Sequence, residues 1–262
     1  MSESKNQYAI ITGASRGIGK AIAIELARKH FNLILLARSG DELKDLQNEL
    51  TNAYAIDVRF LAIDLSLPGA VKHVSQWITA QSLPIHALIN NAGYGLWGQF
   101  DQLSIEPQLE MCDLNINTLV ELCHLLIPLL LKEKQSYILN VSSTAAYQAV
   151  PALAVYSATK AFVLSFTRAL RYELKNTSIS VSCLCPGPVD TGFAKRAGLD
   201  AFSELAEKFN MQPGKVAEVA VKGLLSRKAE IIPGASNALS AFATRLVPKS
   251  WVERIAAGLY KT

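Results

Sequence analysis

The chain has 262 residues, half of them hydrophobic, and carries a formal net charge of +4. That length suits one large α/β domain with a deep core, so a single domain over residues 1–262 is expected. The positive charge is spread without a basic run, which argues against a nucleic-acid partner. The polar start of the chain has no secretory pattern, so a cytoplasmic location is expected. The cysteines lack metal-finger spacing, so reduced thiols and no metal site are expected for Cys112, Cys123, Cys183 and Cys185.

The first apolar run, Tyr8–Thr12, leads into a glycine-rich turn and then into a helical pattern from Lys20 to Lys29. Between a strand and a helix, such a turn lets the backbone approach a pyrophosphate, while the helix N-terminus supplies unpaired amides and positive potential. The glycine spacing is G-x-x-x-G-x-G, which is weak evidence when taken alone. The turn consists of Gly13, Ala14, Ser15, Arg16, Gly17, Ile18 and Gly19.

The second apolar run, Phe31–Ala37, ends at Arg38. At this point NAD-binding units place a carboxylate for the ribose hydroxyl, whereas an arginine suits the 2′-phosphate of NADP. Arg16 adds a second guanidinium, and two guanidiniums bind a phosphate well, so NADP is favoured over NAD. Alternatively, Arg38 only solvates the strand end and pairs with Asp41 or Glu42.

A charged amphipathic helix is predicted over Asp41–Leu50, and a strand over Val58–Ile63 that closes at Asp64. Asp64 could accept a hydrogen bond from an adenine amino group, or could cap the helix that begins near Pro68. The next strand, Ile85–Ile89, ends in Asn90, Asn91, Ala92 and Gly93. Small residues and amides at this position suit a cofactor crevice, and they are also ordinary turn formers.

A long helical pattern from Leu109 to Leu131 contains Asn115 and Asn117. A polar amide inside an apolar helix needs a partner and can distort the helix locally. The most apolar part of this pattern, Leu119–Leu131, is too short to cross a bilayer. A strand over Tyr137–Val141 follows and ends in Ser142 and Ser143.

Tyr156 and Lys160 lie four residues apart in the next helical segment, so they share one face of it. An ammonium close to a phenol in a partly desolvated site lowers the pKa of the phenol, which would let Tyr156 exchange protons near pH 7. A sixth strand, Ile179–Leu184, ends in a proline turn that runs from Pro186 to Thr191. A flap over residues 192–213, a helix over Val216–Ser226 and a strand over Glu230–Ile232 complete an α/β doubly wound parallel sheet.

Taken in order, these motifs resemble the short-chain dehydrogenase/reductase family, in its compact one-domain branch, over about residues 8 to 235. The resemblance rests on the glycine turn, Asp64, Asn90 to Gly93, Asn115, Ser143, Tyr156 with Lys160, and Pro186 to Thr191. It implies a Rossmann fold with seven strands, a nicotinamide cofactor, and a homodimer or homotetramer built on the long helices.

The resemblance also implies roles for single residues. Tyr156 matches the catalytic acid and base, and Lys160 the cation that lowers its pKa and binds the nicotinamide ribose. Ser143 matches the hydroxyl that polarises a carbonyl, with Ser142 as its rival, and Asn115 matches the anchor of a relay water, with Asn117 as its decoy. The implied cofactor contacts are Gly13, Ser15, Arg16, Gly17, Ile18, Gly19, Arg38, Asp64, Asn91, Ala92, Gly93, Tyr156, Lys160, Pro186, Gly187, Val189 and Thr191.

Two functions follow. The first is an NADP(H)-dependent oxidoreductase that interconverts a carbonyl and an alcohol, with a lipophilic substrate suggested by the apolar residues of the flap. The alternative is a non-enzymatic module that binds NADP(H) or senses redox state. The C-terminal extension, residues 236–262, has a basic amphipathic pattern; packing on its own or a neighbouring subunit is favoured over contact with a membrane surface.

Overall fold

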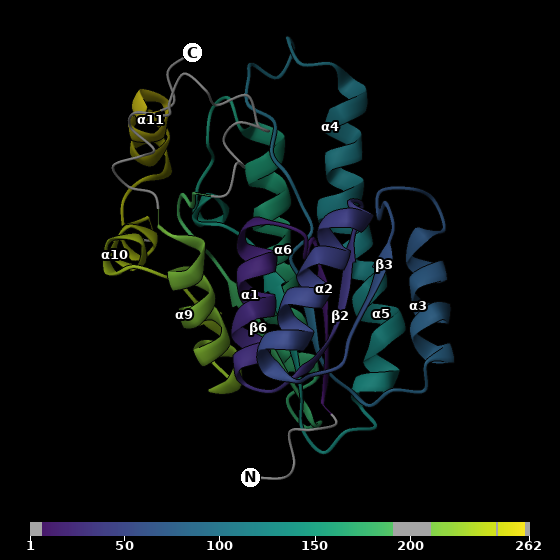
Figure 1. The fold of residues 1–262 in the computed structure, drawn as a ribbon. Coiled ribbons are helices and arrows are strands. Elements are labelled where there is room, and N and C mark those ends of the chain that lie inside the picture. Colours follow the sequence, from purple (N-terminus) through teal and green to yellow (C-terminus); the bar gives the residue numbers. More distant parts are fainter. Residues whose placement is uncertain (1–6, 191–210, 245, 260–262) are drawn as a thin grey trace.

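The computed structural model describes residues 7–190, 211–244 and 246–259, and shows a seven-stranded parallel sheet between two layers of helices (Figure 1). Every expected strand is present, and each end lies within one residue of the expected one. The strands are β1 (Tyr8–Thr12), β2 (Asn32–Ala37), β3 (Val58–Ala62), β4 (Ile85–Asn90), β5 (Ser136–Val141), β6 (Ile179–Leu184) and β7 (Glu230–Ile231).

The sheet has the strand order β3-β2-β1-β4-β5-β6-β7. The chain therefore runs outward from β1 to β3, returns to the middle, and continues outward in the other direction from β4. The loops after β1 and β4 leave neighbouring strands toward opposite sides. Sheets of this topology bind ligands in a crevice at the carboxyl ends of these two strands. β1 and β2 are buried along their whole length because helices cover both faces of the sheet.

Three helices pack on each face of the sheet. Apolar side chains of α1 (Gly17–Arg28), α2 (Gly40–Tyr54) and α9 (Pro213–Leu225) form the core on one face. Those of α3 (Ala70–Ala80), α5 (Thr118–Leu130) and α6 (Ala154–Glu173) form the core on the other. α9 begins at Pro213, three residues before the expected start, because proline suits the first position of a helix.

The predicted long helix is interrupted. α4 (Ile105–Cys112) passes into a π-helical turn, η2 (Asp113–Asn117), before α5 begins. The interruption lies at Asn115, as expected for a buried amide that takes partners outside its own helix. The whole stretch Ile105–Leu130 is long and apolar enough to cross a membrane by composition, yet α5 packs against β4, β5 and α3 as a core helix does.

The residues on either side of the expected flap pair with each other. Val189 pairs with Met211 in an isolated parallel bridge, and Asp190 donates to the Met211 carbonyl over 3.1 Å. Residues 211–213 thus belong to this bridge and to the start of α9, which corrects the far boundary of the flap. Residues 192–210 lie outside the described part of the chain. Two further helices, α10 (Ala235–Ala243) and α11 (Lys249–Leu259), follow β7.

Candidate active site

The glycine turn after β1 is tied to the loop after β4 by hydrogen bonds. Asn91 Nδ2 donates to the carbonyl oxygens of Thr12 (2.9 Å) and Gly13 (3.2 Å). Thr12 Oγ1 accepts from the backbone amides of Asn91 and Ala92, each over 2.9 Å. Thr12 was not among the predicted site residues. The feature of the sequence that points to Thr12 is a small polar residue at the end of an otherwise hydrophobic strand.

Two glycines of this turn have no room for a side chain. Gly13 has a φ of +65°, and an added Cβ would lie 2.9 Å from Asn91 Nδ2. A Cβ on Gly19 would lie 2.2 Å from the Gly13 carbonyl oxygen. Beside them, Arg16 is the N-cap of α1, and no side chain caps the helix. These glycines are needed for the tight turn and the close packing of α1. The turn, which includes Ser15, Gly17 and Ile18, leads into a helix whose first amides are uncapped, as an anion such as a pyrophosphate requires.

Two exposed ion pairs lie at the predicted adenosine end. Arg16 Nη2 is 2.9 Å from Glu42 Oε1, and Arg38 Nη1 is 3.5 Å from Asp64 Oδ2. Burial opposes ionisation of Asp64, but hydrogen bonds from Ser66 and the charge of Arg38 outweigh it and lower the pKa of Asp64. The partner of Arg38 is thus Asp64, whereas the alternative above named Asp41 or Glu42.

Asp64 does not cap the following helix. Its Oδ1 accepts from the backbone amide (3.0 Å) and hydroxyl (2.7 Å) of Ser66. The N-cap of α3 is Gly69, which makes no side-chain hydrogen bond to the helix. The capping alternative for Asp64 is therefore wrong, because the carboxylate closes a local turn ahead of the helix. The adenine contact stays a prediction.

Tyr156 and Lys160 share the buried face of α6, as their spacing predicts. The Lys160 Nζ lies 5.7 Å from the centroid of the Tyr156 ring and donates to the carbonyl oxygen of Val141, at the end of β5, over 3.0 Å. Burial lowers the pKa of Lys160 from 10.5 to about 8. At that pKa the amine is still about nine-tenths protonated at pH 7, so a cation is present next to the phenol.

Asn115 reaches the same centre from η2. Its Nδ2 donates to the Tyr94 carbonyl and to Thr159 Oγ1, each over 3.0 Å, and its Oδ1 accepts from the Tyr94 amide over 3.1 Å. A Cβ on Gly93 would lie 2.7 Å from Asn115 Oδ1 and 3.4 Å from Lys160 Nζ, so these three residues converge.

Asn117, the other asparagine of this turn, has different surroundings. Asn117 is exposed, and its Nδ2 donates to Asp113 Oδ1 over 2.7 Å. Thr159 was not predicted as a site residue. It lies between Tyr156 and Lys160, and a hydroxyl on the buried face of this helix would have indicated it.

The two serines after β5 have separate surroundings. Ser142 is buried and its Oγ donates to the Lys160 carbonyl over 2.7 Å, which fixes β5 to α6. Ser143 is half-buried and begins the 3₁₀ turn η3 (Thr144–Tyr147), where its Oγ accepts from the Ala145 amide over 3.1 Å. Ala145 packs against the cluster that contains Tyr156, so the turn of Ser143 lies beside the tyrosine.

Two anchors hold η3 in place. At its start, the Thr144 amide donates to the Pro186 carbonyl over 2.9 Å. At its end, the Tyr147 hydroxyl donates to Glu230 Oε1 over 2.7 Å, and Glu230 also pairs with Arg168 of α6 at 2.9 Å. Tyr147 and Glu230 were not predicted, because nothing in the sequence links residues from η3 and β7.

The proline turn after β6 closes the crevice. A Cβ on Gly187 would lie 2.6 Å from the Asn237 amide, so α10 packs directly behind this turn. Val189 lies in the bridge to Met211, and Thr191 is outside the described residues. Within the described ranges, no group of three or more His, Cys, Asp or Glu side chains is arranged to hold a metal ion.

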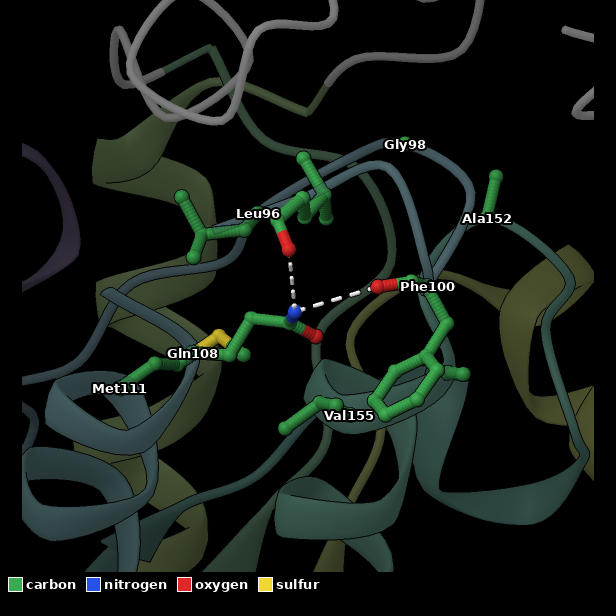
Figure 2. A pocket seen from close by; sticks show the side chains of 9 residues that line it. Leu96, Gly98, Phe100, Gln108, Met111, Ala152 and Val155 are labelled. Atoms are coloured by element: carbon green, nitrogen blue, oxygen red, sulfur yellow. Dashed lines mark hydrogen bonds between the residues drawn. The ribbon is translucent and has the colours of Figure 1, made fainter. Parts of the chain in front are cut away.

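A small cavity adjoins the cluster around Tyr156 (Figure 2). Figure 2 shows Gln108 pointing into it, and its Nε2 donates to the carbonyls of Phe100 (3.3 Å) and Leu103 (3.1 Å). Met111, one of the lining residues, also packs in the Tyr156 cluster. The cavity is lined by Leu96, Gly98, Phe100, Leu103, Gln108, Met111, Ala152, Ala154 and Val155.

Comparison with known proteins agrees with this fold. The sequence pattern of the short chain dehydrogenase family matches residues 7–201. The very-long-chain 3-oxoacyl-CoA reductase of Rattus norvegicus is 32% identical over 195 residues, which are 72% of this chain and 61% of that protein. The chain thus spans less than two thirds of that relative's length.

Two solved structures share the architecture. A short-chain dehydrogenase from Sphingobium yanoikuyae in complex with NADPH is 29% identical, with a TM-score of 0.81 over 92% of this chain and 94% of that one. A short-chain dehydrogenase/reductase from Burkholderia phymatum in complex with NAD is 24% identical and has the same fold, with a TM-score of 0.82 over the same shares. The chain belongs to the short-chain dehydrogenase/reductase family of oxidoreductases.

Proposed function

We propose that this protein is an NADP(H)-dependent oxidoreductase that reduces a lipophilic ketone or aldehyde to an alcohol, or catalyses the reverse reaction. The observation that carries the proposal is the buried Tyr156 and Lys160 pair, with the ammonium 5.7 Å from the phenol ring. Burial that lowers the pKa of a lysine to about 8 costs stability, which makes the site a candidate for a functional one. A purely binding module could use Lys160 to bind the nicotinamide ribose, but it has no use for a proton donor beside it.

Each residue of the proposed active site has a separate role in the reaction. When bound, the nicotinamide supplies or accepts the hydride. Ser143 donates a hydrogen bond to the substrate oxygen, and Tyr156 delivers its phenolic proton to that oxygen. Lys160 stabilises the resulting tyrosinate by its charge, since an ammonium close to a phenolate favours the ionised form. Asn115 and Gly93 lie next to the Lys160 amine, where Asn115 would hold the water that returns the proton.

The cofactor would lie across the crevice between β1 and β4. The Gly13 to Gly19 turn would bind the pyrophosphate, and Asp64 the adenine. Asn91, Ala92 and Gly93 would line the ribose and nicotinamide region together with Pro186, Gly187, Val189 and Thr191. Arg16 and Arg38 support NADP over NAD, because both guanidiniums stand at the adenosine end and are exposed enough to reach a 2′-phosphate.

A lipophilic substrate is supported by the apolar surroundings of Tyr156. Tyr94, Met111, Val150 and Leu153 are buried in one cluster with it. The flap residues that suggested an apolar substrate from the sequence lie outside the described ranges. The relative named very-long-chain 3-oxoacyl-CoA reductase makes 3-oxoacyl thioesters a first class to test.

We also propose that the protein forms a homodimer or homotetramer through its long helices. Leu125 on α5 and Phe162 on α6 are 36% and 40% exposed, and the Phe162 ring stacks on that of Phe166 with centroids 6.0 Å apart. Exposed apolar residues on neighbouring helices suit a contact between identical subunits. The mass in solution, measured by light scattering, tests this.

The function is tested by NADPH consumption over a panel of ketones, aldehydes, diketones, steroids and 3-oxoacyl thioesters. Tyr156→Phe removes the proton donor but keeps the ring, so cofactor binding should persist while turnover falls by at least about a hundredfold. Tyr172→Phe, which removes an exposed phenol near the other end of the same helix, is the matched control. Near wild-type turnover in Tyr156→Phe would refute the assignment of Tyr156 as the proton donor. Cofactor binding without turnover on any compound would favour the non-enzymatic alternative.

A further inference from the structure

The C-terminal part of the chain exposes large apolar side chains instead of burying them. Among the described residues 235–244 and 246–258, only Ala241 and Ala256 have buried side chains. Of the two packing partners expected for this extension, its own subunit does not cover the large apolar residues, and packing on a neighbouring subunit stays a prediction. The exposed ones are Leu239 (68%), Phe242 (56%), Leu246 (72%), Trp251 (62%) and Ile255 (64%).

These residues lie on defined helix faces. Trp251 and Ile255 are four apart on α11, and Leu239 and Phe242 are three apart on α10, so each pair shares one side of its helix. Each helix thus turns an alanine toward the protein and its largest apolar residues toward solvent. This is the reverse of a core helix, and it indicates a surface that is covered by something else.

The charge of the same segment is strongly biased. Residues 235–262 contain Arg245, Lys249, Arg254 and Lys261 but one acidic residue, Glu253, so their net charge is +3. The whole chain has +4, which leaves +1 for residues 1–234. No ion pair neutralises Lys249 or Arg254 within the part of the chain that the structure describes. The segment therefore combines exposed apolar surface with uncompensated positive charge.

We propose that α10 and α11 bind the surface of a lipid bilayer that contains anionic lipids. Trp251 and Ile255 would enter the headgroup boundary, while Lys249 and Arg254 contact lipid phosphates. Tryptophan suits this boundary because its ring is apolar and its N–H is polar. A second copy of the chain is a poorer partner, since residues 1–234 are nearly neutral and supply no excess of acidic charge.

The position of the segment relates it to the crevice. In Figure 1 the first strand begins at the lower end of the sheet, and α11 lies at the upper end, toward which the parallel strands run. Asn237 of α10 packs directly behind Gly187 of the proline turn. A bilayer bound by this segment would thus lie near the proposed site of a lipophilic substrate. Interfacial binding occurs from the aqueous side and is compatible with the expected cytoplasmic location.

The test is flotation of the full chain with vesicles. One set contains equal parts of phosphatidylcholine and phosphatidylglycerol, and the other contains phosphatidylcholine alone. We expect binding to the anionic vesicles that weakens as salt is added. The double variant Lys249→Gln/Arg254→Gln should bind these vesicles about 30-fold more weakly, because two basic residues near an anionic surface together contribute about 2 kcal/mol, which corresponds to that factor. Trp251→Ser/Ile255→Ser should abolish flotation.

Matched controls separate this surface from general stickiness. Lys72→Gln removes an exposed charge from α3, and Tyr172→Ser removes an aromatic side chain that is 70% exposed on α6. Both should float like the wild type, and all variants should keep NADPH binding. Absence of flotation, or equal losses in the controls, would overturn the proposal. So would a change from dimer to monomer in Trp251→Ser/Ile255→Ser without any vesicle binding, since that result identifies a subunit interface.

Discussion

The two ends of the crevice hold their charged side chains in opposite ways. At the proposed adenosine end, Arg16 and Arg38 are 67% and 51% exposed and pair with Glu42 and Asp64. At the proposed catalytic end, Lys160 is 6% exposed, and its amine donates to a backbone carbonyl. Exposed ion pairs contribute about 0–1 kcal/mol each, whereas a buried charge is costly to keep.

The exposed arginines can exchange their partners, whereas the buried lysine is fixed in place. An arginine that leaves an exposed carboxylate for a phosphate loses little, so the adenosine end can rearrange when a ligand arrives. Lys160 is held by the packing of α6 on β5 before any ligand is present, so its charge needs no reorganisation during the reaction. The predictions below test the fixed end first and the exchangeable end afterwards.

The largest effect is expected on turnover from Lys160→Met. Methionine keeps much of the apolar stem but removes the charge that stabilises the tyrosinate, so kcat should fall by about a hundredfold to ten-thousandfold. The measurement is steady-state turnover on the best substrate of the panel. Lys175→Met, just beyond the end of α6, is the control and should be unaffected. Turnover within a few-fold of the wild type would mean that the buried amine has no catalytic use.

The same variant should make the protein more stable. The pKa of Lys160 is about 8 in the folded state and 10.5 for an unperturbed lysine side chain, so the unfolded chain binds more protons between these pH values. The free energy of unfolding of the wild type should therefore rise from pH 8 to 10.5, by up to about 3 kcal/mol from this group. Below pH 8, Lys160→Met should be the more stable protein.

Urea unfolding of both proteins at several pH values measures this effect. The difference between the two curves isolates Lys160 from tyrosines and other groups that titrate in the same range. A pH-independent difference would show that the folded state does not lower the pKa of this amine.

The sequence predicted the buried residues of the proposed catalytic end better than it predicted the residues that hold them in place. Helical spacing placed Tyr156 and Lys160 on one face, and the ordered set of motifs around them gave the pair its role. A polar amide in an apolar run predicted a local distortion of the helix, and the family resemblance selected Asn115 over Asn117. Thr12 and Thr159 were missed because each acts through contacts with residues far along the chain. Local spacing carries no information about which distant loop a buried hydroxyl will meet.

The strand pattern was predicted almost to the residue, because a parallel sheet covered on both faces gives continuous apolar runs. The partners of exposed charges were not. Arg38 pairs with Asp64, in the loop after the neighbouring strand β3, rather than with Asp41 or Glu42. The register of β2 and β3, which places Ala37 opposite Ala62, brings the two residues together. The outward face of Trp251 and Ile255 was likewise open to either interpretation from the sequence.

At the exchangeable end, the arginines should decide the choice of cofactor. A hydrogen bond to a charged group contributes about 1.5–3 kcal/mol, so Arg38→Ala and Arg16→Ala should each weaken NADPH binding by about tenfold to a hundredfold. NADH lacks the 2′-phosphate, so its affinity should hardly change. Titration of both cofactors by fluorescence gives the comparison within each variant. Equal losses for NADPH and NADH would place these arginines elsewhere on the nucleotide and remove the argument for NADP.

The smallest effect is expected from Glu42→Gln. This change breaks the ion pair with Arg16 but keeps the length of the side chain, and the unfolding free energy should fall by less than about 1 kcal/mol. Glu49→Gln, which breaks the similarly exposed pair with Lys20, is the control and should behave alike. A loss well above that range for Glu42→Gln alone would mean that the pair is structural. Arg16 would then be bound to its carboxylate too firmly to turn toward a phosphate, and the contrast between the two ends of the crevice would fail at this residue.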